Sequence, residues 1–287
     1  MTKTKCVFLL LAGQLLALPL AAAGAAQARP PRLLIKTTAL ASILASRNVR
    51  ILDVRSPDEY RLGHLPGAVN LPARTTEDLA ANRRGFPMPP EWAQRLFRMA
   101  GVSAGSRVVL YDDQGYLFAA RVFYVLEFFG HPRVQVLDGG WRKWQSEGRP
   151  VTTEPAKIAP GDFTPKPNPA LIATTEWLAA HLKDVKLVDA RSPGEYVSGH
   201  IPGAINIDWS RTLEPGESRL LRPAEQLEAL FAAAQVRRNQ EVVTYCEWAS
   251  RAAELYFVLR LLGYPRVRVY DGSWEDWSAN PALPVER

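Results

Sequence analysis

The sequence predicts an α/β protein of two similar domains, each with a parallel sheet covered by helices on both faces. Sequence blocks of the first half return in the same order in the second half, and short β-branched runs alternate with longer helical stretches in each half. A proline-rich segment separates the two halves. At 287 residues and 47% apolar, the chain can form two hydrophobic cores.

The first 28 residues have the pattern of a secretory signal peptide. Lys3 and Lys5 give a basic start, residues 7–20 form an apolar run too short to favour a membrane span, and AQA at 26–28 supplies small residues for cleavage. We therefore expect a periplasmic or secreted protein without stable membrane association after the leader is removed. An uncleaved anchor stays open as an alternative, because the alanines extend the apolar stretch.

The two domains are expected at residues 29–150 and 171–287, joined by a linker at 151–170. The linker carries five prolines, which preclude regular structure and give a semi-rigid connection. The repeats themselves are three pairs of blocks. LDVRSPDEYRLGHLPGAVN (52–70) returns as VDARSPGEYVSGHIPGAIN (188–206), VVLYD (108–112) as VVTYC (242–246), and FGHPRVQVLDGGWRKW (129–144) as LGYPRVRVYDGSWEDW (262–277).

Strands and helices alternate within each copy. Helices are expected at 119–130 and 251–263, and each ends at a glycine with a proline two residues beyond, as a helix C-cap does. Apolar strands separated by helices are typical of a parallel sheet, in which ligands bind at the carboxyl ends of the strands. The strands are expected at 49–54, 107–112, 133–138, 185–190, 241–246 and 266–271.

Without the leader, Cys246 is the only cysteine, and it follows the strand-like run EVVTY. A single thiol in an exported protein is paired with another chain, buried and inert, or reactive. The first copy has Asp112 at this position, and an aspartate is almost never buried without a partner. The comparison favours a reactive thiol at a polar loop mouth.

The residues after Cys246 favour an anion. The segment CEWAS leads into a helix at Arg251, so unpaired backbone N–H groups point toward one place, where they would stabilise a thiolate or an anionic substrate. Features that occur in both copies are expected to serve the fold instead. These include Asp53 and Asp189, and the GHxPGA turns that contain His64 and His200.

Several function classes lack support in the sequence. The net charge of +6 is mild and no long basic stripe occurs, so we expect no nucleic-acid partner. No CxxC, HExxH, P-loop or GxGxxG motif is present, so we expect neither a metal nor another cofactor.

Over about residues 33–287, the chain resembles the tandem-domain rhodanese family of thiosulfate/3-mercaptopyruvate sulfurtransferases. The resemblance is carried by the twin DxRSPxEYxxGHxPGAxN segments, by VVTYC with the loop that follows it, and by YDGSWEDW. The resemblance implies two rhodanese-like domains, of which the first is non-catalytic and the second catalytic. It also implies that Cys246 takes sulfane sulfur from an anionic donor, thiosulfate or 3-mercaptopyruvate, as a persulfide. The sulfur then passes to a thiol or cyanide acceptor, or to a protein acceptor.

Further residues are carried over from the family. Arg191 corresponds to a substrate-binding arginine, but Arg55 has the same place in the first copy, so a structural ion pair stays open as well. Asp271 and the segment around Trp274 are expected to shape the pocket wall, and core packing is the alternative role of Trp274. The active loop implied by the resemblance consists of Cys246, Glu247, Trp248, Ala249, Ser250 and Arg251.

The loop departs from the family pattern, since it has neither the cations nor the glycine and hydroxyl residues usual after the cysteine. Glu247 would repel a dianion such as thiosulfate if it points inward, whereas Arg251 acts in the opposite direction. Trp248 offers an apolar face to a larger donor or a partner protein. Ala249 stands where a glycine is usual, so a positive φ there would carry strain.

Two alternatives remain open at this point. One is a sulfur-relay or binding module with low turnover, which the unusual pair Glu247-Trp248 favours. The other is a Cys-dependent phosphatase or arsenate reductase, whose loop needs one residue more between Cys and Arg than the four found here.

Overall fold

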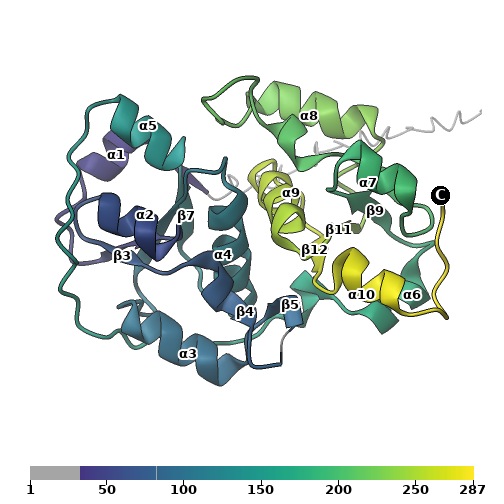
Figure 1. Ribbon diagram of the computed structural model, residues 1–287, viewed down its shortest axis with the longest axis horizontal. Coiled ribbons are helices and arrows are strands. Elements are labelled where there is room, and N and C mark those ends of the chain that lie inside the picture. Colours follow the sequence, from purple (N-terminus) through teal and green to yellow (C-terminus); the bar gives the residue numbers. More distant parts are fainter. Residues whose placement is uncertain (1–32, 82) are drawn as a thin grey trace, which may run out of the picture.

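The computed structural model describes residues 33–81 and 83–287, which form two α/β domains that lie side by side (Figure 1). The predicted leader, residues 1–28, lies outside this part of the chain. Among the described residues, no helix has the length and apolar character needed to cross a bilayer.

Each domain has five parallel strands and five α-helices, with a few shorter elements. The N-terminal domain contains β1 (Leu34–Ile35), α1 (Thr37–Ala41), β2 (Val49–Asp53), α2 (Pro57–Leu62), β3 (Ala68–Asn70), η1 (Ala73–Thr76), β4 (Glu77–Asp78), β5 (Arg83–Pro87), α3 (Pro90–Met99), β6 (Arg107–Tyr111), α4 (Leu117–Phe128), β7 (Val134–Leu137) and α5 (Gly140–Ser146). The C-terminal part contains η2 (Pro169–Leu171), β8 (Ile172–Ala173), α6 (Thr175–His181), β9 (Lys186–Asp189), α7 (Pro193–Ser198), β10 (Ile205–Asn206), η3 (Trp209–Thr212), α8 (Ala224–Ala233), β11 (Val242–Tyr245), α9 (Ser250–Leu261), β12 (Val267–Tyr270) and α10 (Ser273–Ala279).

The strand orders are β1-β7-β6-β2-β3 and β10-β9-β11-β12-β8, and all neighbours within them pair in parallel. The six predicted strands correspond to β2, β6, β7, β9, β11 and β12, which confirms them. The edge strands β1, β3, β8 and β10 were not predicted. They are two or three residues long and therefore give no apolar run in the sequence.

Helices cover both faces of each sheet, as predicted. In β6, Val108 and Leu110 pack in the same apolar cluster as α3 and α4, whereas Val109 and Tyr111 pack with Trp144 of α5. The alternation follows from strand geometry, because successive side chains point to opposite faces of a sheet. Apolar residues at every position of the strand are thus explained by burial on both sides.

The long helices α4 and α9 pack against each other at the centre of the molecule (Figure 1). The rings of Phe123 and Phe257 meet edge to face at 5.0 Å, and Arg260 on α9 forms an ion pair of 2.7 Å with Glu127 on α4. A single apolar cluster continues through both helices and so joins the two domains. Both helices are followed by a glycine with φ of +80°, the C-cap that the sequence predicts.

The segment predicted as a linker runs along the N-terminal domain. The Gly161 N–H donates to the Arg98 carbonyl (2.8 Å), and the Lys166 N–H donates to the Phe129 carbonyl (2.8 Å). Phe163 is buried in the core of that domain. The prolines prevent a helix or sheet strand here, but side-chain burial and backbone hydrogen bonds fix the segment to the domain.

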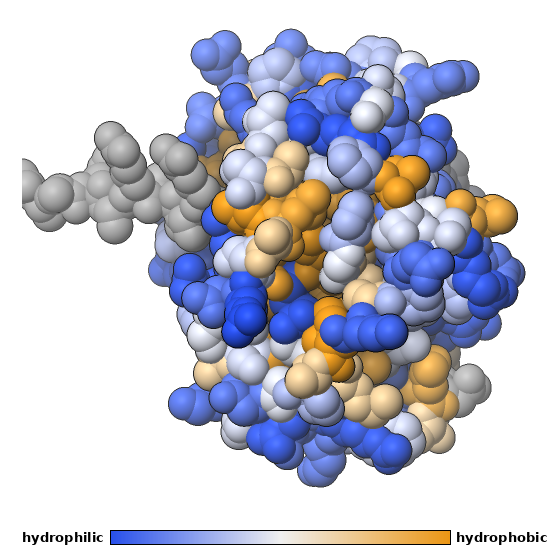
Figure 2. Space-filling view, turned by 90° about the vertical axis from the view of Figure 1, so that its left-hand side faces the viewer, coloured by the Kyte–Doolittle hydropathy of each residue, from blue (hydrophilic) through white to orange (hydrophobic). Residues whose placement is uncertain are grey.

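The outer face of the N-terminal domain is mostly hydrophilic, with hydrophobic residues gathered in a central band (Figure 2). This face lies on the side of the domain away from α9 (Figure 1). It is therefore remote from the carboxyl end of β11, where Cys246 lies.

Candidate active site

Cys246 is the first residue after β11, at the carboxyl end of the strand, as the sequence predicts. Its carbonyl accepts the Trp274 N–H (2.8 Å), which fixes the segment after β12 to the loop. The residue is only 1% exposed. The predicted position at a polar loop mouth is therefore wrong for this structure, in which Cys246 is buried in the apolar cluster that includes β11 and α9.

Asp112 occupies the matching position in the N-terminal domain and is also buried, at 3% exposed. The correspondence is geometric, since the Asp112 carbonyl accepts the Trp141 N–H at 2.8 Å, as Cys246 does with Trp274. The buried Asp112 carboxylate is stabilised by a ring of backbone donors. The two carboxylate oxygens accept the N–H groups of Gln114 (3.1 Å), Tyr116 (3.1 Å), Phe118 (2.8 Å) and Ala119 (2.9 Å).

The N-terminal copy therefore shows what the loop geometry binds, namely an anion. Counted from the starts of α4 and α9, Phe118 and Ala119 correspond to Arg251 and Ala252. The N–H groups of Arg251 and Ala252 belong to the first turn of α9, where a helix has no carbonyls of its own to accept them. The carboxyl end of β11 is thus built to hold negative charge beside Cys246.

Ala249 has φ of 63° and precedes α9 in the left-handed region, so the predicted strain is present. Ser273, at φ of 53°, supports the same loop and was missed by the sequence analysis. Its hydroxyl accepts the N–H groups of Cys246 (3.3 Å) and Ala249 (3.1 Å). The repeat holds a signal for it, because the first copy has Gly140 in DGGW where the second has serine in DGSW.

Arg251 lies in the first turn of α9 and forms a two-pronged ion pair with Glu195 at the start of α7. Both N–O distances are 2.8 Å. Burial alone would lower the pKa of Arg251, but the bonds to Glu195 and the nearby sulfur of Cys246 raise it above its ordinary value. The same ion pair lowers the pKa of Glu195 to about 2. Arg251 is therefore a permanent cation beside the thiol.

Arg191 is buried and forms the structural ion pair that the sequence left open. Its Nε and Nη2 groups donate to Asp189 at 2.7–3.1 Å, and Nη2 also donates to the Gly199 carbonyl (2.7 Å). Arg55 makes the same contacts with Asp53 and the Gly63 carbonyl. The remaining nitrogen, Nη1, lies 3.7 Å from a carboxylate oxygen of Glu247 and so faces the active loop.

The side chains of Glu247 and Trp248 lie at the edge of the loop. Glu247 is 28% exposed, and burial raises its pKa while Arg191 opposes the shift. Trp248 is 43% exposed, and the guanidinium of Arg84 lies over its ring, 4.9 Å from the centroid. Ser250 begins α9 rather than ending the loop, so the loop proper is Cys246–Ala249.

The hairpin of β4 and β5 reaches from the N-terminal domain to the active loop (Figure 1). Gly85 in β5 has φ of +79°, and a Cβ atom there would lie 2.7 Å from the Asp271 carbonyl and 2.9 Å from the Trp248 carbonyl. The C-terminal domain approaches the loop of the N-terminal domain in the same way. A Cβ at Gly115 of the N-terminal loop would lie 2.7 Å from Leu213 of the C-terminal domain. Each domain thus approaches the loop of the other, and the N-terminal domain closes the side of the site at Trp248.

Gly85→Ala is expected to displace β5 and lower kcat/KM of the reaction at the Cys246 loop at least tenfold, because small misplacements in an active site cost up to ~10²-fold. Gly67→Ala is the matched control, since Gly67 has nearly the same φ (+77°) but open space within 4 Å of its Cβ position. Both should lose about 1 kcal/mol of stability to the backbone strain. Equal activities of the two variants would show that contact at Gly85 does not shape the site.

Asp271 does not form a pocket wall, which corrects the expectation. It is fully buried, lies 3.7 Å from the guanidinium of Arg121 on α4, and accepts a hydrogen bond from the Tyr124 hydroxyl (3.3 Å). Burial raises the pKa of Asp271 to about 7, although Arg121 opposes the shift. Trp274 stacks on Arg191, 4.6 Å from the guanidinium carbon to the ring centroid, and holds that side chain in place.

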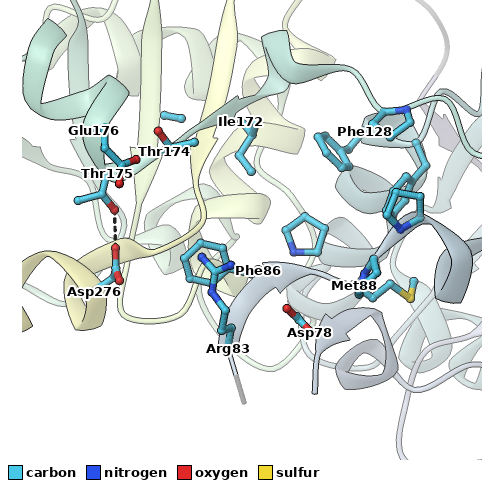
Figure 3. Close-up of a pocket in the computed structure, with 16 residues that line it drawn as sticks. Asp78, Arg83, Phe86, Met88, Phe128, Ile172, Thr174, Thr175, Glu176 and Asp276 are labelled. Carbon is cyan, nitrogen blue, oxygen red and sulfur yellow. Dashed lines mark hydrogen bonds between the residues drawn. The ribbon is translucent and has the colours of Figure 1, made fainter. Parts of the chain in front are cut away.

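A separate cavity of about 510 Å³ lies between the domains, with walls from β5, β8 and the start of α6 (Figure 3). Arg83 and Phe86 come from the N-terminal side, and Thr175 and Asp276 from the C-terminal side. None of residues 246–251 lines it. The cavity is therefore distinct from the loop that carries the thiol.

Comparison with known proteins agrees with this geometry. The family model for the Rhodanese-like domain matches twice, at residues 36–147 and 174–280. The chain belongs to the rhodanese family. The two rhodanese domains correspond to the two sheets, and the second of them carries Cys246.

Curated relatives of this rhodanese match along nearly their whole length. The "Sulfur carrier protein TtuD" of Thermus thermophilus is 34% identical, over 90% of this chain and 97% of its own. The "Thiosulfate sulfurtransferase" of Azotobacter vinelandii is 32% identical, over 88% and 97%. Among solved structures, SseA of Escherichia coli, described as a 3-mercaptopyruvate sulfotransferase, matches with a TM-score of 0.76 and 27% identity, over 84% and 98%.

Proposed function

We propose that this sulfurtransferase moves sulfane sulfur from a small anionic donor, thiosulfate or 3-mercaptopyruvate, to a thiophilic acceptor through a persulfide on Cys246. The names of the relatives support transfer between small sulfur compounds. The observation that carries the proposal is the match between Asp112 and Cys246, because the first copy holds a negative charge where the second would hold a persulfide anion.

The chemistry has two steps. The Cys246 thiolate attacks the sulfane sulfur of thiosulfate, the new S–S bond forms as the old one breaks, and sulfite leaves with the electron pair. With 3-mercaptopyruvate, the C–S bond breaks instead, and the thiol proton ends on the carbon of pyruvate. In the second step cyanide attacks the outer sulfur, thiocyanate leaves, and the thiolate is restored. Splitting one transfer into two displacements lowers each barrier.

The surrounding residues have assigned roles in this proposal. The N–H groups of Arg251 and Ala252 and the dipole of α9 stabilise the thiolate and the persulfide. The Arg251 guanidinium adds a positive charge, and Ser273 holds the loop in its left-handed turn. Arg191 mainly positions the neighbouring Glu247, because Asp189 and the Gly199 carbonyl occupy most of its N–H donors.

The test is the intact mass of the purified protein before and after thiosulfate or 3-mercaptopyruvate, each followed by cyanide. We expect a gain of one sulfur atom, which cyanide removes as thiocyanate. No gain from either donor, with a free titratable thiol, would contradict the proposal and make phosphate and arsenate turnover the next assays.

A protein acceptor is the second candidate, a relay with low turnover on small molecules. Trp248 favours it, because a large aromatic side chain 43% exposed beside the loop is a suitable contact for a partner. The relative named as a sulfur carrier protein is consistent with such a relay. A persulfide that loads readily but leaves slowly to cyanide would distinguish the relay from the enzyme.

Export to the periplasm or the outside is also part of the proposal. Its support is the leader pattern, with Lys3 and Lys5 before an apolar run and small residues at 26–28. In protein purified from an exporting bacterial host, the measured mass should correspond to a chain that starts at Arg29. A full-length mass would favour the uncleaved anchor.

A further inference from the structure

We propose that the carboxylates of Glu195 and Glu247 determine the sulfur donor, by occupying the two arginines next to Cys246 and so disfavouring dianions. The preferred donor would then carry a single carboxylate, as 3-mercaptopyruvate does, and thiosulfate would be the poorer substrate. This inference rests on the proposed sulfur transfer and concerns its selectivity.

Glu195 has two functions, and only one of them is shared by both domains. As the third residue of α7 it forms a capping box with Ser192, and Glu59 forms the same box with Ser56 at the start of α2. The ion pair with Arg251 exists only in the catalytic domain, because the residue that corresponds to Arg251 in α4 is Phe118. The fold therefore explains the capping box but not the ion pair.

Arg251 donates two of its five N–H groups to this carboxylate. Both of its terminal nitrogens bond Glu195 oxygens at 2.8 Å, so an incoming anion must share or displace Glu195 to use the guanidinium. Displacing one member of a charge-assisted pair costs more than binding to a free cation, and the cost must be recovered from the donor. A donor that needs two positive charges is the most affected.

Glu247 acts on the other arginine. Arg191 has one nitrogen directed to the loop, and Glu247 lies 3.7 Å from it. The groups that face the Glu247 carboxylate are Arg191, Arg251, Glu195 and Glu275. Two cations and two further carboxylates therefore surround it, and none of the positive charge is left unbalanced.

The ion pairs beside the thiol carry a net negative charge before the thiolate forms. In these pairs Arg191 and Arg251 contribute two positive charges, and Asp189, Glu195 and Glu247 contribute three negative ones, which leaves −1. Glu275, which also faces Glu247, adds a further negative charge. A charge of this sign repels a dianion about twice as strongly as a monoanion. At a separation of a few ångströms this difference in repulsion is large enough for a tenfold preference.

The experiment compares kcat/KM for thiosulfate and for 3-mercaptopyruvate, with cyanide as acceptor, in Glu195→Gln and Glu247→Gln. Glutamine keeps the capping box at position 195, so charge is the main change. The matched controls are Glu59→Gln, which has the same capping box, and Asp113→Asn, which follows Asp112 as Glu247 follows Cys246.

We expect the unmodified protein to prefer 3-mercaptopyruvate, and the ratio of thiosulfate to 3-mercaptopyruvate kcat/KM to rise at least tenfold in both glutamine variants but not in the controls. A ratio that stays within twofold in both variants, or a preference for thiosulfate in the unmodified protein, would overturn the inference while sulfur transfer stands. Failure of every donor to load Cys246 would overturn sulfur transfer itself. If Glu195→Gln does not fold, Glu247→Gln carries the test alone.

Discussion

Cys246→Ser is expected to lower sulfur transfer by about 10³-fold or more, to the background rate, because a hydroxyl cannot form the persulfide on which both steps depend. Loss of a catalytic nucleophile commonly has effects of this size. The measurement is thiocyanate formation under saturating donor and cyanide, together with intact mass after donor alone. The variant should gain no sulfur atom from either donor.

The control is the melting temperature of the variant. Cys246 is buried among apolar residues, so a serine there adds a polar group at a cost of about 1–3 kcal/mol. We therefore expect a folded protein with a modestly lower melting temperature, and Cys246→Ala offers a second variant without the hydroxyl. A folded Ser or Ala variant that still produced thiocyanate would refute the assignment of the thiol.

Asp112→Ala should have the largest effect on stability, a loss of about 3–5 kcal/mol in the free energy of unfolding. The carboxylate accepts four backbone N–H groups at 2.8–3.1 Å, and its removal leaves these buried donors without an acceptor. Burial raises the pKa of Asp112, and the four N–H groups oppose that shift. The anion is thus held by its donors rather than by solvent.

Chemical denaturation with urea would measure this loss, with Asp113→Ala as the neighbouring control. Asp113 is half-buried at the loop edge, and its carboxylate accepts a hydrogen bond from the adjacent Gln114 side chain instead of a ring of buried backbone donors, so its loss should cost less than about 1 kcal/mol. If Asp112→Ala were no worse than Asp113→Ala, the ring of donors would not be satisfied by the carboxylate. Asp112 would then be no guide to the charge that the loop after Cys246 stabilises.

The sequence determined the architecture and pointed to the thiol that we propose as the nucleophile. An internal repeat needs no structure to be seen, and apolar runs with glycine C-caps predict the same parallel strands and helices that occur in both domains. The repeat also singled out Cys246, because Asp112 replaces it in the first copy. Local patterns and chain duplication are sufficient for such conclusions, since strand period and capping depend on neighbouring residues.

The tertiary structure decided the surroundings of the thiol. The pairing of Arg251 with Glu195, 56 positions away, depends on how α7 and α9 meet, and no local pattern specifies it. The hairpin β4–β5 lacks a continuous apolar run, and its contact with the loop comes from the other domain. Both are long-range contacts, which sequence periodicity does not encode.

The burial of Cys246 is the clearest case in which the sequence alone led to a wrong expectation. From the sequence, an aspartate at the matching place indicated a polar loop mouth, yet both residues are buried. The reason is that backbone N–H groups can satisfy a buried charge as well as water can, and their convergence depends on the turn between strand and helix. The sequence pointed to the thiol that we propose to react, whereas the fold set the hydrogen-bond donors, the counter-charges and the domain contact around it.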